Sequence, residues 1–205
     1  MKITTLFFLI LLICTSCAST KIEPSQWQSK AFKAHNFNRL LVYASTDDKA
    51  LQVRFEEKLA KLFSEQGIVP LKMNELFPEI EYQENHSQEE INEFVIRCKE
   101  KNIDKVLLAS QKSIEIDTVR AKTLHNYMNS LEPLKMTSGS KNEEELQYDE
   151  KEIITYTIEA AVYDIAKSSE DKPIASTTLK ATNPKSYNVL ENKLLKAIKK
   201  LFKSR

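Results

Sequence analysis

The sequence predicts a single α/β domain, of two or three layers, on a mixed sheet of about five strands. Three observations support this prediction. Short apolar runs of strand length occur near residues 40–43 and 104–109. Segments with helical periodicity and capping signals separate and follow them. A later pair of strand-like segments is joined by a polar turn. The expected element order is β-α-β-α-β-β-β-α, with the last two strands forming an antiparallel hairpin.

The first strand and helix follow directly from residues 40–67. Residues 40–43 are apolar without alternation, which is typical of a strand buried on both faces. Asp47 or Thr46 can cap the next helix, and Gly67 stands where a left-handed C-terminal residue is favoured. The apolar side chains of this helix recur at helical spacing: Leu51, Phe55, Leu59, Leu62 and Phe63.

A second strand (68–71), a second helix and a third strand (104–116) continue the pattern. Ser87 and Glu90 form a capping-box signature at the start of the helix, because each side chain can accept a backbone N–H there. The stripe expected to be buried on this helix is Ile91, Phe94, Val95 and Cys98. Alternating strands and helices imply parallel pairing with right-handed crossovers.

The last third of the chain predicts a hairpin and a closing helix. Residues 153–165 and 174–181 have strand character and flank a polar turn. Asn183-Pro184 or Ser186 opens the helix, whose expected core residues are Leu190, Leu194, Ile198 and Leu201. Residues 120–150 lack periodicity and are expected to form a long insertion, which in a compact domain is usually functional or disordered.

The first residues predict export from the cytoplasm. Lys2 precedes an apolar run from Leu6 to Ile13, too short to span a bilayer, that ends at Thr15-Ser16-Cys17. Residues 1–16 are therefore interpreted as a signal peptide. Cys17 resembles the lipobox cysteine of bacterial lipoproteins, with Cys14 standing where leucine is usual. The alternatives are secretion with cleavage near Ala18, or an uncleaved apolar start.

The lipobox resemblance implies that Cys17 is acylated, with palmitate among its fatty acids, and becomes the mature N-terminus. Several acyl chains would hold the protein on a membrane much longer than one chain. Residues 17–36 are polar and are expected to form a flexible tether, so the domain should span 37–205. The expected location is the bacterial cell envelope, at the outer membrane and facing the periplasm.

Composition excludes several classes of protein. Lys2 is the only charge before Cys17, so 29 basic and 29 acidic residues remain after it. A balanced chain lacks the positive field that nucleic-acid binding requires.

Once Cys14 is removed and Cys17 acylated, Cys98 is the one thiol left, so no intramolecular disulfide is expected. We interpret Cys98 as a packing residue; the alternative is a catalytic or redox thiol.

The sequence contains no recognisable catalytic signature. The chain has 2 glycines, whereas phosphate-binding loops need glycine for backbone amides to approach the anion. His35, His86 and His125 are widely spaced and form no metal-binding motif. No cofactor or metal site is therefore expected. An acidic cluster at 143–152 could bind a basic partner or calcium, or be a solvated loop.

The element order over residues 37–203 resembles the small α/β domain of several envelope proteins. These are the amino-terminal domain of TolB, the outer-membrane lipoproteins that activate penicillin-binding proteins, and the curli-secretion lipoprotein family. The resemblance implies a non-enzymatic adaptor or assembly factor that binds other envelope proteins. The alternative is an enzyme or small-ligand binder with a pocket at the carboxyl ends of the parallel strands, near Ser45, Thr46 and Ser110. The sequence leaves the oligomeric state open.

Overall fold

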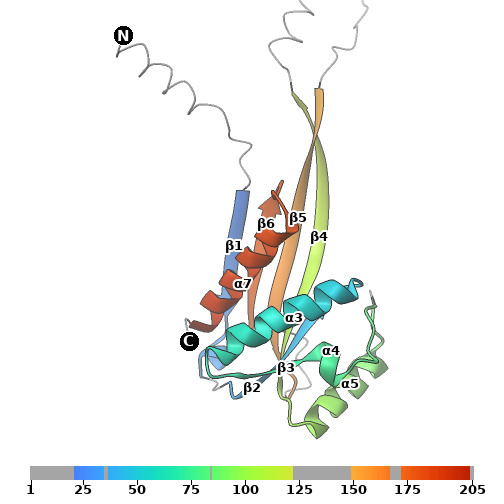
Figure 1. The fold of residues 1–205 in the computed structure, drawn as a ribbon, viewed down its shortest axis with the longest axis vertical. Coiled ribbons are helices and arrows are strands. Elements are labelled where there is room, and N and C mark those ends of the chain that lie inside the picture. The colour runs from blue at the N-terminus through green and yellow to red at the C-terminus, as the bar shows by residue number, and fades with distance from the viewer. Residues whose placement is uncertain (1–20, 35–36, 84, 122–148, 167–171, 204–205) are drawn as a thin grey trace, which may run out of the picture.

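A computed structural model describes residues 21–34, 37–83, 85–121, 149–166 and 172–203. In this part of the chain, one sheet of six strands is combined with five helices (Figure 1). The elements are β1 (Lys21–Gln28), α2 (Lys30–Ala34), β2 (Arg39–Ser45), α3 (Lys49–Ser64), β3 (Val69–Lys72), α4 (Met73–Leu76), α5 (Gln88–Glu100), β4 (Lys105–Ala121), β5 (Asp149–Asp164), β6 (Ala175–Thr182) and α7 (Tyr187–Lys203).

The strand order β1-β6-β5-β4-β2-β3 confirms the predicted mixed α/β sheet, with one strand more than expected. β2 pairs in parallel with both β3 and β4, as the alternation of strands and helices predicts. The other pairs are antiparallel, and β5 with β6 forms the predicted hairpin. The parallel half and the antiparallel half meet at β4.

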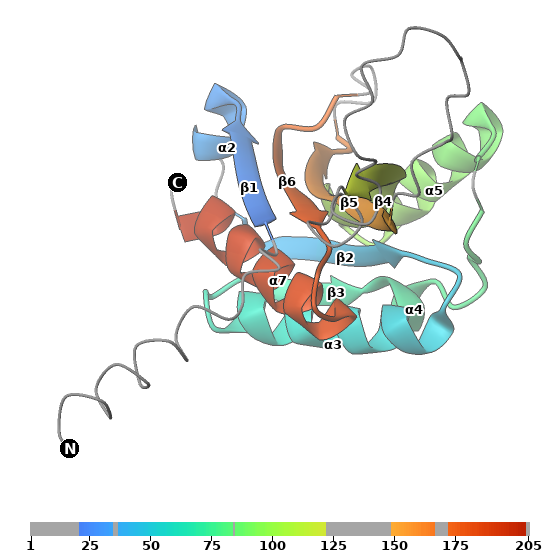
Figure 2. The same ribbon diagram turned by 90° about the horizontal axis from the view of Figure 1, so that it is seen from above.

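Helices cover both faces of the sheet, so the domain has three layers (Figure 2). Leu40, Val42 and Leu107 contribute to a large core under α3 and α7, which we call the α3/α7 core. Leu41 and Val106 point to the opposite face, into a smaller core with Cys98, which we call the α5 core. These alternating contacts confirm that β2 is buried on both faces.

The prediction of a flexible tether over 17–36 is wrong for residues 21–34, and the domain begins earlier than residue 37. β1 pairs with β6 along its whole length, from Lys21 opposite Thr182 to Gln28 opposite Ala175. Most β1 side chains are exposed, so main-chain hydrogen bonds to β6, together with the side chains of Gln26 and Gln28, hold the strand. A strand of this kind carries no apolar pattern from which sequence reasoning could find it.

The ends of the helices confirm most of the capping predictions. Asp48, rather than Asp47 or Thr46, caps α3, because its side chain accepts from the Leu51 N–H at 3.0 Å. Gly67 follows α3 with a φ of +75°, the left-handed conformation predicted for it. Ser87 and Glu90 form the complete capping box of α5.

β4 and β5 are longer than predicted and extend past the start of β1 (Figure 1). Lys21 pairs with Thr182, Thr182 pairs with Thr155, and Thr155 pairs with Glu115. These four residues therefore lie at the same height on four neighbouring strands. Six further residue pairs lie beyond that level, which corresponds to about 20 Å of strand. The ends of the predicted insertion at 120–150 are thus strand, and residues 122–148 lie outside the described residues.

The closing helix confirms its predicted core, since Leu190, Leu194, Ile198 and Leu201 are all buried. At its start, the Ser186 hydroxyl accepts from the Val189 N–H at 3.4 Å. The predicted signal peptide and Cys17 lie outside the described residues. Among the helices that are described, none has the length and apolar character needed to cross a bilayer.

Candidate functional site: a groove beside helix α5

A cleft of about 790 Å³ lies between α5, the segment that precedes it, and the sheet. Its floor is formed by side chains of β2, β4 and β5 together with Ile165: Tyr43, Val106, Leu108, Tyr163 and Asp164. Its walls are formed by Ile80 on one side and by Ile91, Phe94 and Val95 of α5 on the other. We call this cleft the α5 groove. Its apolar floor and walls make it suited to an apolar surface.

The groove exists because α5 is fixed to the domain at its C-terminal end. Cys98 is fully buried, and the Phe94 ring packs edge-on against Phe77 at 5.6 Å between centroids. The Arg97 guanidinium lies over the same Phe77 ring, 5.0 Å from its centroid, and forms an ion pair with Glu79. By contrast, all six residues from Gln88 to Glu93 are exposed. The first half of the helix therefore stands away from the sheet.

Ile91 is the residue at which the predicted buried stripe fails. Its side chain is 44% exposed, although its spacing from Phe94, Val95 and Cys98 is that of a core residue. Ile91 lines the groove instead of the core. Helical spacing identifies the side of a helix that faces the protein, but it does not show whether that side meets packed atoms or an open cleft.

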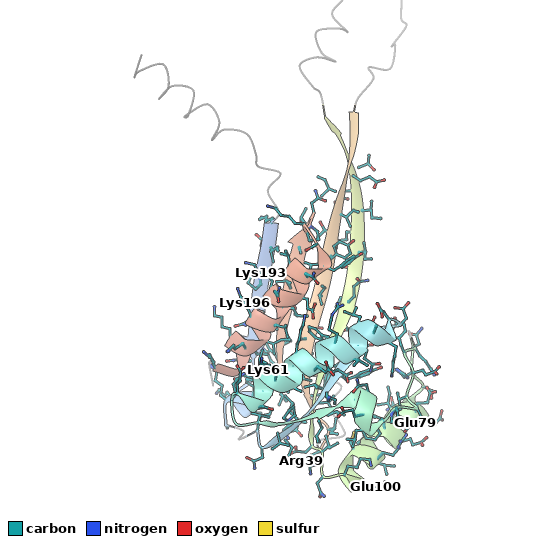
Figure 3. All side chains as sticks on the ribbon, in the orientation of Figure 1. Arg39, Lys61, Glu79, Glu100, Lys193 and Lys196 are labelled. Atoms are coloured by element: carbon teal, nitrogen blue, oxygen red, sulfur yellow. The ribbon has the colours of Figure 1, made fainter. Side chains whose placement is uncertain are left out.

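The rim of the groove is acidic. Carboxylates from the connector and from α5 line it: Glu79, Glu81, Glu90 and Glu93. Arg97 is the arginine among the lining residues, and it is paired with Glu79. The hydrogen bond from Arg97 lowers the pKa of Glu79, and the Ser87 backbone N–H lowers that of Glu90. Both carboxylates are therefore ionised at neutral pH (Figure 3 labels Glu79).

A buried ion pair closes one end of the groove floor. Lys105, at the start of β4, lies 3.0 Å from a carboxylate oxygen of Asp164, at the end of β5. It also lies 3.0 Å from Asp104. The side chains of Lys105 and Asp164 are only 6% and 4% exposed, so each charge depends on the other. The pair joins the two strands where the groove begins.

Glu56 is a second buried carboxylate, and it holds the other side of the floor in place. It accepts hydrogen bonds from the Ala44 N–H at 3.1 Å, the Asn74 N–H at 2.9 Å and the Gln52 amide at 3.0 Å. These bonds join the end of β2 to α3 and α4. Burial raises the pKa of Glu56, and the hydrogen bonds oppose that increase.

The arrangement offers binding surface rather than an activated nucleophile. Burial raises the pKa of the Cys98 thiol to about 12, and Cys98 does not line the groove. Burial also raises the pKa of Tyr43 and of Tyr163, so both phenols stay protonated at neutral pH. Within the described residues, no group of three or more His, Cys, Asp or Glu side chains is placed to hold a metal ion.

The alternative site at the strand ends is only partly assembled. Ser45 and Ser110 are register partners on β2 and β4, as the parallel pairing predicts. Neither they nor Thr46 lines the α5 groove. The cleft lies on one face of the sheet instead of at its carboxyl edge, because β4 continues for eleven residues past Ser110.

The α5 groove is the feature that sequence reasoning missed. Its strongest sequence signal is the row of carboxylates from Glu79 to Glu93. Acidic residues in the first turn of a helix also stabilise its dipole, so the row alone does not indicate a site.

Comparison with known proteins gives structural likenesses and no family. No family model matches the chain, and no curated protein matches it. The PelC dodecamer of Paraburkholderia phytofirmans aligns with a TM-score of 0.45 and 11% identity, over 88% of this chain and 97% of that one. A point variant of the same PelC dodecamer aligns with a TM-score of 0.40, 10% identity and coverages of 89% and 94%. The lipoprotein GNA1162 of Neisseria meningitidis aligns with a TM-score of 0.39, 12% identity and coverages of 82% and 99%.

Proposed function

We propose that this protein is a lipoprotein of the bacterial cell envelope, acylated on Cys17, that binds another envelope protein through the α5 groove. It acts as an adaptor or assembly factor without catalysis of its own. We place it at the outer membrane, facing the periplasm. The predicted signal peptide supports export to the envelope, and the lipobox pattern supports the acylation of Cys17.

The observation that carries the binding proposal is the apolar cleft with an acidic rim. Tyr43, Tyr163 and Phe94 offer aromatic surface of the kind enriched at protein interfaces. The rim carries four carboxylates and one arginine. A partner segment with apolar side chains flanked by lysine or arginine complements both features.

A second candidate function is small-ligand binding in the same groove. A volume of about 790 Å³ falls within the range of sites for small molecules, and most of the lining is apolar. We favour the protein partner because the first half of α5 leaves the groove open along one side, and enclosed pockets suit small ligands better.

Site-specific crosslinking tests the proposal and separates the two candidates. A photoreactive amino acid replaces Ile91, which lines the groove, or Ile96, which is 57% exposed on the same helix and does not line it. Both variants are expressed as the full chain and irradiated in native membranes. We expect position 91 to yield a protein adduct of defined mass and position 96 to yield none.

The products decide between the hypotheses. Replacing Glu81 and Glu93 with lysine, which leaves the capping box of α5 intact, should reduce the adduct at position 91, because the rim charge then repels a basic segment. An adduct of small mass at position 91 would favour the ligand-binding alternative. Equal adducts at positions 91 and 96 would contradict a groove-specific interaction.

A further inference from the structure

The outer face of α7 carries a stripe of lysines. Lys193, Lys196, Lys200 and Lys203 recur at spacings of three and four residues and are all exposed. The buried residues of α7, among them Leu194 and Ile198, point the other way, into the α3/α7 core. Within the described part of the chain, no carboxylate pairs with any of the four lysines. We call them the α7 lysine stripe.

The surroundings of the stripe add positive charge. Over its whole length α7 has five lysines and one glutamate, a net charge of +4. That glutamate, Glu191, is buried and lies 2.8 Å from Lys58 of α3. Lys61 of α3 is also exposed near α7, and Figure 3 shows Lys61, Lys193 and Lys196 on these two helices. Glu79 and Glu100 are labelled apart from these lysines, at the lower right of the same view, where α5 lies.

The stripe also lies beside the strand with which the described chain begins. Gln26 and Gln28 of β1 donate hydrogen bonds to the Ala197 and Leu201 carbonyls of α7, at 2.8 and 2.7 Å. β1 begins at Lys21, four residues after Cys17. Four residues span at most about 14 Å, whereas α7 is about 25 Å long. A membrane that holds Cys17 is therefore within a short distance of β1 and α7.

We propose that the α7 lysine stripe rests on a bilayer that contains anionic phospholipid and forms a second membrane contact beside the acyl anchor. This inference rests on the proposed acylation of Cys17. Lysines spaced along one exposed helix face complement a plane of phosphate headgroups better than a single pocket. A polybasic surface next to a lipid anchor also fixes the orientation of a domain, which the anchor alone does not.

This orientation has a consequence for the α5 groove. α7 and α5 cover opposite faces of the sheet, so a membrane along α7 leaves the groove open on the far side (Figure 2). The acidic rim would then be kept away from the negative lipid surface, which favours the same orientation.

Lysine footprinting of the lipidated full chain tests the inference. The protein is reconstituted in vesicles of phosphatidylcholine alone, or of an equimolar mixture of phosphatidylcholine and phosphatidylglycerol. An amine-reactive reagent and mass spectrometry give the labelling rate of each lysine. We expect the stripe to label roughly five times more slowly in the mixed vesicles, and the difference to disappear in high salt. Lys99, exposed on α5, is the internal control and should label equally in both.

The same samples distinguish the possible failures. Equal labelling of the stripe in both vesicles overturns the inference. A further sample in detergent, without vesicles, serves as the reference. Protection of the stripe that is already present there overturns the inference too, because a second copy of the chain then covers the stripe.

The mass of the N-terminal peptide shows whether Cys17 is acylated. If it is not, vesicles are added to the unacylated chain: sedimentation with the mixed vesicles alone supports the stripe, and its absence overturns it. Lys193→Gln with Lys196→Gln and Lys200→Gln should abolish the protection of Lys203, and Lys99→Gln should not.

Discussion

At the scale of single residues, two buried ionisable groups lie close to the groove without serving chemistry in it. Cys98 packs in the α5 core, and Glu56 joins three elements through its hydrogen bonds. Both have a raised pKa because burial disfavours the charged form. Each therefore gives a prediction about stability.

Cys98 should behave as a packing residue. A thiol with a pKa of about 12 has almost no thiolate at neutral pH, so it should react slowly with maleimide in the native state and rapidly in denaturant. Cys98→Ala should lower the free energy of unfolding by about 1 kcal/mol, because the loss of sulfur leaves a small void. Rapid labelling of the native protein would show that the thiol is accessible and the assignment wrong.

Glu56 should make stability depend on pH. Its pKa is raised above the ordinary value of 4.5, so the folded state binds the proton more tightly than the unfolded chain. The contribution of Glu56 to stability is then complete at a pH below its pKa in the unfolded chain. It is lost as the pH rises through its higher pKa in the folded protein. The difference in unfolding free energy between wild type and Glu56→Gln should decrease from acid to neutral pH. Denaturant titrations measure it, with Glu57→Gln as the exposed control. A difference that grows with pH would contradict the assigned direction.

At the scale of elements, the capping box matters more for α5 than for a fully packed helix. The residues from Gln88 to Glu93 are exposed, so tertiary packing does little to hold the first turns. The Ser87 hydroxyl accepts from the Glu90 N–H at 3.2 Å, and the Glu90 carboxylate accepts from the Ser87 N–H at 2.7 Å. The wall of the groove therefore depends on this cap.

Ser87→Ala should loosen that wall. The substitution leaves the Glu90 N–H without its acceptor and should cost about 1 kcal/mol of helix stability. Hydrogen exchange of the amides in residues 88–93 should accelerate, while exchange in α3 and α7 stays unchanged. Ser64→Ala, at the end of α3, is the matched control. If exchange in 88–93 is unaffected, the cap does not hold the groove wall.

At the scale of the whole molecule, most of the fold could be predicted from the sequence because most elements bury apolar side chains in a regular pattern. Leu40 to Val42 and the core residues of α7 are clear examples. β1 could not be predicted, because main-chain pairing with β6 and two glutamine side chains hold a mostly exposed strand. The groove could not be predicted either, since Ile91 has the spacing of a core residue.

The anchor gives a prediction at the same scale. Cys17→Ala should leave an unprocessed precursor and abolish acyl labelling, whereas Cys14→Ala should have little effect, because it changes a residue that the signal peptidase removes. Metabolic labelling with a fatty-acid analogue measures both. Acyl labelling that persists in Cys17→Ala would show that another residue is modified.

A protein partner that occupies the α5 groove in the envelope must shield the residues that line it, and cysteine accessibility in membranes measures that shielding. Because Cys98 is fully buried, Ile91→Cys and Ile96→Cys each add one reactive thiol to the mature chain. Both variants are treated with a water-soluble maleimide, first in native membranes and then after purification in detergent. We expect Ile91→Cys to be protected in membranes and to react once the partner is removed, while Ile96→Cys reacts in both conditions. Equal reaction of Ile91→Cys in membranes and in detergent would show that no partner occupies the groove.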